Sequence, residues 1–170
     1  VEWFIVHEIE QKGSIPTQNF YPKRYLYDIG LLRFIRESVI PNISANETLD
    51  EVLRTPLGGL IENVILLSIL SKEGISSQIS GWKKNNKEAV EIDFIIKKEN
   101  SIIPIEVKAT KKIARKHYLN LISYMKNHRV SKGVIFSFDE YKVFELDEGL
   151  KIINIPSYLV DSLFDLYFAV

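Results

Sequence analysis

The sequence contains no cysteine. Disulfide bonds, thiolate zinc sites and cysteine nucleophiles are therefore excluded, and we expect a protein of the reducing cytoplasm. No apolar run approaches the roughly 20 residues that a transmembrane helix requires, and the N-terminus lacks the basic and then apolar layout of a signal peptide, so we expect no membrane partner. A Gly-x-x-x-x-Gly-Lys-Ser/Thr sequence is also missing, which excludes ATP binding through a phosphate loop of that kind.

Net charge is zero, because 22 basic side chains balance 22 acidic ones, but the two signs are unevenly distributed along the chain. Between Trp82 and Lys132 there are 13 Lys and Arg residues and 5 Asp and Glu residues, a net charge of +8, and the remaining residues carry −8. A segregated positive field can neutralise phosphates and steer a polyanion, although a solvated lysine-rich surface would give the same count. The cations that we expect to contact nucleic acid are Lys83, Lys84, Lys111, Lys112, Arg115 and Lys116.

Length and hydrophobic content bound the organisation of the chain. Its 170 residues, 46% of them hydrophobic, suffice for one main core and a small appendage. We place an N-terminal extension at residues 1–56 and a core domain at residues 57–170, because residues 41–56 are polar and have a proline at each end. A strand-like run at residues 3–9 begins almost at once, so we expect the chain to be a piece of a longer protein.

The spacing of hydrophobic residues predicts the elements of the core domain. An apolar helix is expected at residues 57–72, and it is followed by three strands, a helix and a strand. A further pair of strands and a final helix complete the chain, which gives a mixed α/β fold with a central sheet flanked by helices. The expected strands are 77–82, 89–97, 101–109, 133–138, 141–146 and 151–155, and the later helices are 115–127 and from 157 onward.

Two of these strands carry carboxylates at alternate positions. If they form a tight hairpin, residues whose numbers sum to 199 face each other, which sets Phe94 opposite Ile105 on one face and Asp93 opposite Glu106 on the other. Opposed side chains have β-carbons about 5 Å apart, so the two carboxylates require a cation between them, either Lys108 or a divalent metal ion. Oxygen ligands without histidine or thiolate favour Mg²⁺ or Mn²⁺. The same register pairs Ile96 with Ile103, Ile92 with Val107 and Glu91 with Lys108.

Glu62 supplies a third acid from the apolar helix at residues 57–72. Its neighbours on the helical wheel are Ile65, Leu66 and Ile69. Because burying an unpaired ion is unfavourable, Glu62 must find a partner, be protonated or ligate a metal. An ordinary glutamate at the boundary of the core is the alternative interpretation.

Glu62 on a helix, Asp93 on a strand and Glu106-Val107-Lys108 on the next strand resemble the restriction-endonuclease-like (PD-D/E-x-K) superfamily, whose core order is α-β-β-β-α-β. The chain more closely resembles the uncharacterised C-terminal domain that follows the ATPase module in many prokaryotic AAA-type ATPases, over roughly residues 23–159. The segments that carry the closer resemblance are Lys23–Leu32, Gly59–Asn63, Val90–Phe94 and Ile103–Lys108.

The resemblance implies a role for each of these residues. Asp93, Glu106 and the backbone carbonyl of Val107 would hold Mg²⁺ or Mn²⁺, Lys108 would position the attacking water, and Glu62 would complete or support the metal shell. It also implies an N-terminal ATPase module in the full-length protein, with the strand at residues 3–9 ending a winged-helix-like segment.

We therefore expect the chain to be the C-terminal nuclease-like domain of an AAA-type ATPase that hydrolyses phosphodiester bonds of DNA with Mg²⁺. One alternative is a catalytically silent nucleic-acid-binding or regulatory module on the same fold. Another is a protein-interaction module that binds an acidic surface. The sequence leaves open DNA against RNA as the substrate and a monomer against the homodimer that many related nucleases form.

Overall fold

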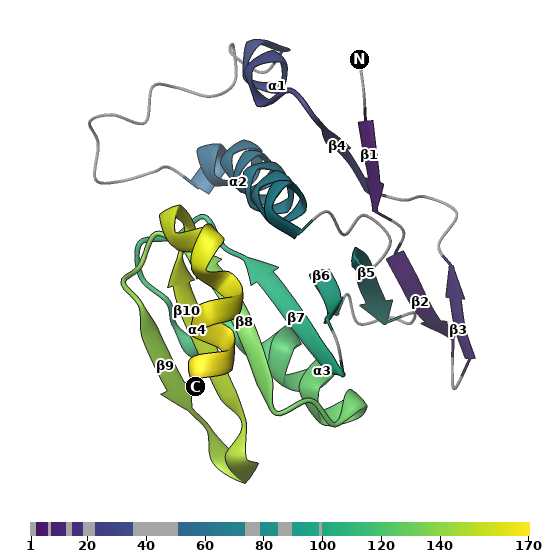
Figure 1. Cartoon of the computed structure of the whole chain (residues 1–170), viewed down its shortest axis with the longest axis vertical. Helices are drawn as coiled ribbons and strands as arrows, with labels where there is room; N and C mark the ends of the chain where they lie inside the picture. The colour runs from purple at the N-terminus through teal and green to yellow at the C-terminus, as the bar shows by residue number, and fades with distance from the viewer. Residues whose placement is uncertain are drawn as a thin grey trace.

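Helices cover both faces of one mixed β-sheet in the computed structural model of the chain (Figure 1). The structure describes residues 3–6, 8–12, 15–18, 23–35, 51–73, 79–84, 90–98 and 100–170. Residues 77, 78 and 89, at which two strands are expected to begin, lie outside this described part of the chain.

The large sheet has eight strands in the order β3-β2-β5-β6-β7-β8-β10-β9. Strand β6 is antiparallel to both of its neighbours, β5 and β7, whereas β7, β8 and β10 run parallel. The predicted mixed α/β fold with a central sheet is therefore confirmed. The strand bounds are β2 (Glu8–Lys12), β3 (Ile15–Gln18), β5 (Ile79–Lys84), β6 (Glu91–Lys98), β7 (Ser101–Val107), β8 (Lys132–Ser137), β9 (Lys142–Glu145) and β10 (Lys151–Pro156).

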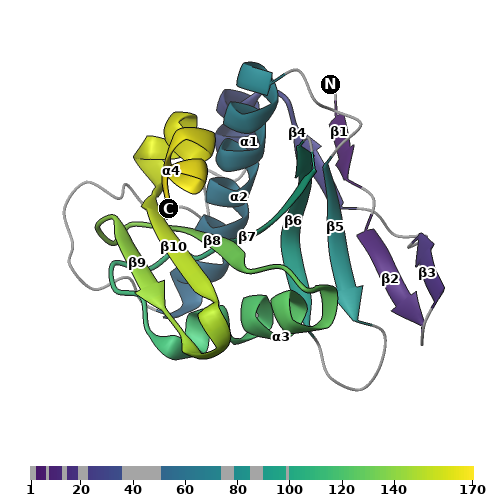
Figure 2. The same ribbon diagram turned by 60° about the horizontal axis from the view of Figure 1, so that its bottom comes forward.

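The helices form a layer on each side of this sheet. In Figure 2, α3 lies on one side, and α2 and α4 lie on the other. From α2 to β8, the order of helices and strands is the predicted helix, three strands, helix and strand. The helix bounds are α1 (Ile29–Ile35), α2 (Glu51–Glu73), α3 (Leu119–His128) and α4 (Leu163–Ala169), with 3₁₀ turns η2 (Arg115–Tyr118), η3 (Asp147–Gly149) and η4 (Ser157–Ser162).

Helix α2 begins at Glu51, six residues before the expected start. The helix therefore continues through Pro56, at which the sequence predicts a break. Proline has a helical φ, but it lacks an N–H donor and crowds the carbonyl four residues before it, so it is accommodated inside a helix only when the rest of the helix is well supported. That support comes from Leu57, Ile61 and Ile65, which are buried against the sheet.

The N-terminal strands lie beside the core rather than apart from it. Strand β1 (Trp3–Val6) pairs with β4 (Lys23–Leu26) in a separate two-stranded sheet, and β2 lies between β5 and the edge strand β3 in the large sheet. Asp28 caps α1, since its Oδ1 accepts a hydrogen bond from the N–H of Leu31 at 2.9 Å. Strand β4 thus leads into a fixed helix start next to α2.

Two clusters of buried side chains hold the layers together. The first joins α2, η4 and α4 to one face of the sheet, and Ile65, Phe94 and Phe136 have no exposed surface in it. The second joins α3 to the opposite face through Leu121 and Met125, which are also fully buried.

Strand β6 contains one extra residue relative to β5. Ser80 pairs with Ile95 and Trp82 pairs with Ile92, so two steps along β5 match three steps along β6. This is a β-bulge, and such bulges bend a strand and redirect its side chains. Asp93 lies within the bulge.

The bulge corrects one expectation from the sequence. Two of the predicted hairpin pairs are confirmed, Phe94 with Ile105 and Ile96 with Ile103. The prediction that Ile92 shares a face with Val107 is wrong, because Ile92 is buried in the second cluster and Val107 in the first. The extra residue between Ile92 and Ile95 moves Ile92 to the face covered by α3.

Candidate functional site

Strands β6 and β7 separate where the predicted acids lie. Among the described residues, the last pair between these strands is Phe94 with Ile105. Beyond it, β6 continues beside β5, while Glu106 and Val107 pair with β8. At this fork, Oδ2 of Asp93 accepts a hydrogen bond from the backbone N–H of Val107 at 2.9 Å. The Asp93 carboxylate is thereby held against the peptide that follows Glu106.

Lys23 reaches the fork from strand β4. Its ammonium lies 2.6 Å from Oε1 of Glu91, 3.1 Å from Oδ1 of Asp93 and 3.2 Å from Oε1 of Glu62. Tyr25 is two residues further along the same strand, and its hydroxyl donates a hydrogen bond to Oε1 of Glu62. Lys23 therefore links the acids of α2 and β6, and Tyr25 adds a second hydrogen bond to the acid of α2.

A buried amide fastens β4 to α2 beside these contacts. The side chain of Asn63 accepts a hydrogen bond from the N–H of Leu26 and donates one to the carbonyl of Leu26, both at 2.9 Å. Asn63 is only 2% exposed. Because Asn63 follows Glu62 and Leu26 follows Tyr25, this pair of bonds fixes the position from which Tyr25 and Lys23 reach the site.

Glu106 is the most deeply buried acid of the site, with 4% of its surface exposed. Its Oε1 accepts a hydrogen bond from the ammonium of Lys108, but no described residue offers its Oε2 a hydrogen-bond partner. Burial, reinforced by the charge of Asp93, raises the pKa of Glu106 to about 8, against the opposing effect of Lys108. The fork therefore contains a buried carboxylate oxygen that would be stabilised by a further cation.

The two lysines of the site are held in their charged form. Burial alone would lower the pKa of Lys23, but Asp93 and Glu62, together with the hydrogen bond to Glu91, outweigh burial and raise it. The pKa of Lys108 is raised in the same way, with Glu106 as the main opposing partner to burial. Both ammonium groups thus act at neutral pH as fixed positive charges and hydrogen-bond donors, not as proton acceptors.

The acid on the helix, Glu62, has two hydrogen-bond partners on strand β4. Burial, and then the charge of Asp93, raises the pKa of Glu62, while Lys23 and Tyr25 counteract this effect. The carboxylate of Glu62 is turned into the site, and Lys23 and Tyr25 occupy its Oε1. Glu62 therefore supports the lysine in this structure.

The donor set suits a hard divalent ion bound by few protein ligands. Within the described part of the chain, no three or more Asp, Glu, His or Cys side chains form a group arranged to hold a metal ion. Mg²⁺, however, commonly keeps several waters and binds through one or two carboxylates. Asp93 and Glu106 offer that number, and the unpartnered Oε2 of Glu106 is an acceptor of the required kind. Val107 contacts the site through its N–H, which donates a hydrogen bond to Asp93.

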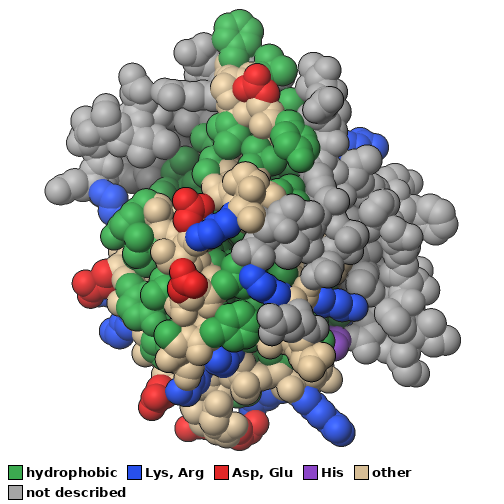
Figure 3. Space-filling model, in the orientation of Figure 1, with side chains coloured by type: hydrophobic (Ala, Val, Ile, Leu, Met, Phe, Trp, Pro, Cys, Tyr) green, Lys and Arg blue, Asp and Glu red, His purple; other side chains and the backbone are tan. Residues whose placement is uncertain are grey.

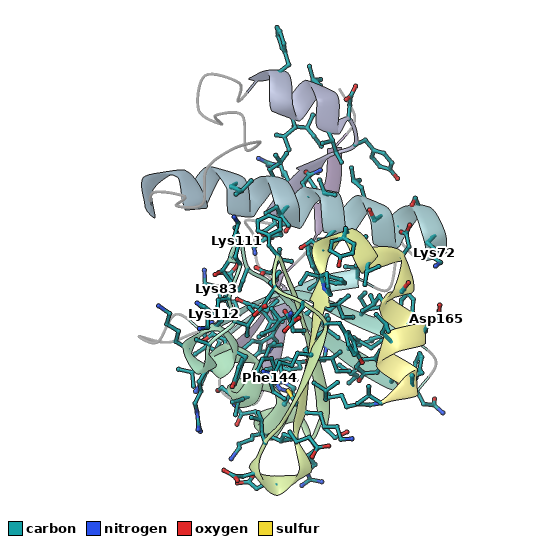
Figure 4. The ribbon with its side chains drawn as sticks, turned by 90° about the vertical axis from the view of Figure 1, so that its left-hand side faces the viewer. Lys72, Lys83, Lys111, Lys112, Phe144 and Asp165 are labelled. Atoms are coloured by element: carbon teal, nitrogen blue, oxygen red, sulfur yellow. The ribbon has the colours of Figure 1, made fainter. Side chains whose placement is uncertain are left out.

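The predicted basic residues lie on neighbouring segments. Lys111 and Lys112 are exposed on the segment that follows β7, Arg115 and Lys116 are exposed in η2, and Lys83 and Lys84 are half-buried at the end of β5. Figure 4 shows Lys83, Lys111 and Lys112 on one side of the molecule, away from Lys72 and Asp165. On the face drawn in Figure 3, by contrast, basic and acidic side chains are interspersed.

Sequence reasoning missed three residues of the cluster, which are Lys23, Tyr25 and Glu91. The sequence does contain a signal for Lys23 and Tyr25. Residues two apart on a strand share a face, and both residues lie in the segment Lys23–Leu32, which carries part of the family resemblance. The register predicted for the hairpin gives Glu91 the partner Lys108, but Glu91 pairs with Lys23. Contacts between residues so far apart in the chain leave no local pattern.

The chain belongs to the family described as a domain of unknown function, DUF4143, whose model matches residues 57–158. The matched part contains the four predicted site residues Glu62, Asp93, Glu106 and Lys108, but not Lys23 or Tyr25. No curated protein matches the sequence. In the described part of the chain, none of the helices combines the length and the apolar character needed to cross a bilayer.

Proposed function

We propose that this domain is a metal-dependent nuclease of the restriction-endonuclease-like class, which hydrolyses phosphodiester bonds of DNA. The observation that carries the proposal is the buried Oε2 of Glu106, which has no partner among the described residues and lies at the strand fork with Asp93 and Lys108. A buried acceptor of this kind is unfavourable unless a ligand satisfies it, and such groups concentrate at functional sites.

Each side chain at the fork has a task in this proposal. Asp93 and Glu106 would hold Mg²⁺ or Mn²⁺, and the ion would lower the pKa of a bound water and stabilise the negative charge that develops on the phosphate. Lys108, kept charged by Glu106, donates hydrogen bonds to the nucleophile or to a phosphate oxygen. Glu62 keeps Lys23 in place, and Lys23 adds positive charge near the phosphate.

The cations beyond β7 support DNA as the substrate. Lys111, Lys112, Arg115 and Lys116 follow Lys108 within eight positions, and no acidic residue interrupts them. All four are exposed, so they can neutralise phosphates on the approach to the site. We also propose that the domain works as the C-terminal part of an AAA-type ATPase, on the strength of the resemblance of its motifs.

A nicking assay on supercoiled plasmid tests the catalytic proposal. The full-length protein is expected to nick DNA with Mg²⁺ or Mn²⁺ and not with EDTA. Glu106→Ala and Lys108→Ala should each lower the rate by about a hundredfold or more, because each removes charge stabilisation at the reacting phosphate. Glu145→Ala, at an exposed acid of β9, is the matched control and should keep the full rate. Undiminished nicking by either site variant would show that the roles are misassigned.

The position of Lys23 favours a second candidate, a catalytically silent nucleic-acid-binding or regulatory module. Its ammonium already neutralises three carboxylates of the cluster, as a metal ion would. A silent module would bind DNA in a salt-dependent manner, would show no cleavage with any divalent ion, and would give no anomalous Mn²⁺ peak between Asp93 and Glu106 in soaked crystals. Such a peak, together with cleavage, would exclude it.

A further inference from the structure

Three exposed aromatic side chains gather at the end of the sheet that carries the candidate site. Strands β7, β8 and β10 are parallel, so their carboxyl ends meet at one edge. Lys108 directly follows β7, Phe138 directly follows β8, and Tyr158 is the second residue after β10. Tyr141 precedes β9 on the same edge. The exposed fractions are 40% for Phe138, 40% for Tyr141 and 81% for Tyr158.

Hydrogen bonds fix the loops that carry these rings. The N–H of Phe138 donates to the carbonyl of Thr110 at 2.9 Å, which ties the β8 end to the segment that leaves Lys108. Asn154, 1% exposed, accepts a hydrogen bond from the hydroxyl of Ser137 and donates one to the carbonyl of Glu140, both at 2.7 Å. The aromatic edge, defined as Phe138, Tyr141 and Tyr158, is therefore a preformed surface.

The rings of the aromatic edge are available to a ligand. Within the described part of the chain, none of the three rings stacks on another aromatic side chain or lies under a cation. Phe138 follows Phe136 by two residues, and the carbonyl of Phe136 accepts the N–H of Lys108. The backbone of Phe138 is thus roughly 7 Å along the strand direction from the level of Lys108.

Charge beside the aromatic edge suits a polyanion. The segment from Lys108 to Lys116 carries five cations and no acid. Two acids lie between Phe138 and Tyr141. The carboxylate of Asp139 accepts hydrogen bonds from the backbone N–H groups of Ile113 and Glu140, which hold it within the protein. Of these two acids, only Glu140 is exposed.

We propose that the aromatic edge binds the unpaired bases of single-stranded DNA and leads that strand to the fork. This inference rests on the proposed function and adds the form of the substrate to it. Flat exposed rings beside lysines stack on bases of any sequence while the lysines bind phosphates. A duplex keeps its base faces stacked internally and cannot offer them to three rings on a sheet edge. The substrate would therefore be a single strand, or the unpaired part of a junction.

Fluorescence anisotropy of the full-length protein in EDTA tests this surface without cleavage. A labelled single-stranded DNA oligonucleotide should bind at least about tenfold more tightly than the same sequence as a duplex. Tyr158→Ala should weaken single-strand binding by about tenfold, the loss typical of one base stack, whereas Tyr158→Phe should keep it. Phe168→Ala is the matched control, because Phe168 is 48% exposed at the opposite end of the sheet, in a pocket with Ser101 and Lys132.

The outcomes separate this inference from the proposed nuclease. Equal affinity for duplex and single strand, unchanged binding by Tyr158→Ala, or tighter binding of an RNA oligonucleotide would overturn the inference even if plasmid nicking were observed. Single-strand binding that depends on Tyr158 would uphold it even if no divalent ion supported cleavage, and in that case the nuclease proposal alone would fail.

Discussion

The ammonium of Lys23 lies 3.1 Å from Oδ1 of Asp93, although the two residues are 70 positions apart in the chain. The same ammonium contacts Glu62 and Glu91, so one side chain from β4 neutralises acids of both α2 and β6. A divalent ion that binds Asp93 would be repelled by this charge or would have to displace it.

Replacing Lys23 by methionine should therefore strengthen metal binding. A unit charge at about 4 Å is worth ~1 kcal/mol in water and more near a protein surface, so Lys23→Met should bind Mn²⁺ at least about fivefold more tightly than the wild type. Isothermal titration calorimetry measures this difference. Lys23→Arg keeps the charge and should keep the wild-type affinity. The same affinity in all three proteins would mean that Lys23 and the metal do not compete.

Asn63→Ala should lower the free energy of unfolding by about 2 to 4 kcal/mol, because both backbone groups of Leu26 lose their partner in a buried place. Urea denaturation followed by circular dichroism measures the change. Ser71→Ala is the control: its hydroxyl bonds the carbonyl of Ser68 on the exposed side of α2, and its loss should cost less than about 0.5 kcal/mol. A similar loss of unfolding free energy in both variants would contradict the role of Asn63 in holding β4 against α2.

Glu106→Gln should change how stability depends on pH in the absence of metal. The pKa of Glu106 rises from 4.5 to about 8 on folding, so the folded state binds its proton more tightly than the unfolded state does. The wild type should therefore lose stability as pH rises through this window, and the glutamine variant should not. At about 1.4 kcal/mol per pKa unit, the difference between the two proteins in free energy of unfolding should change by several kcal/mol as pH rises through this window.

Urea denaturation in EDTA at a series of pH values measures that gap. Glu145→Gln, at an exposed acid with 80% of its side chain accessible, should follow the wild type throughout. Parallel curves for Glu106→Gln and the wild type would show that Glu106 is ionised as easily in the folded protein as in the unfolded chain.

Lys111 and Lys112 should contribute to DNA affinity through phosphates. Replacing both by alanine is expected to lower the slope of log affinity against log salt concentration by about 1.4 for a single strand, at roughly 0.7 for each lost contact. Lys97→Ala provides the control, since Lys97 is exposed on β6 at the end remote from the fork. An unchanged slope in the double variant would remove these lysines from the nucleic-acid interface.

Local pattern in the sequence was sufficient to predict the hairpin that carries the acids. The alternation of Phe94 and Ile96 against Ile103 and Ile105 has one register that buries all four, and this register is observed. The cap at Asp28 was likewise predictable, because it depends on residues within one helical turn.

Features that depend on distant parts of the chain were not predictable in this way. The bulge at Asp93 arises from pairing with β5, and nothing within β6 marks the extra residue. The role of Lys23 depends on β4 lying beside α2. Two hydrogen bonds between Asn63 and Leu26, which are 37 positions apart in the chain, hold β4 there. Lys23 and Tyr25 therefore reach the site from the N-terminal 56 residues, whereas the predicted acids all lie after them.

The bulge in β6 makes the spacing of residues there matter as much as their identity. Removing Phe94 would leave Asp93 as the one residue between Ile92 and Ile95, which both face α3, so strict alternation would return and the Asp93 carboxylate would take the place of Phe94 in the buried layer under α2. Deletion of the single codon for Phe94 would therefore disable the fork while leaving every acid and lysine of the cluster in the gene, so a search for those residues would not reveal the defect.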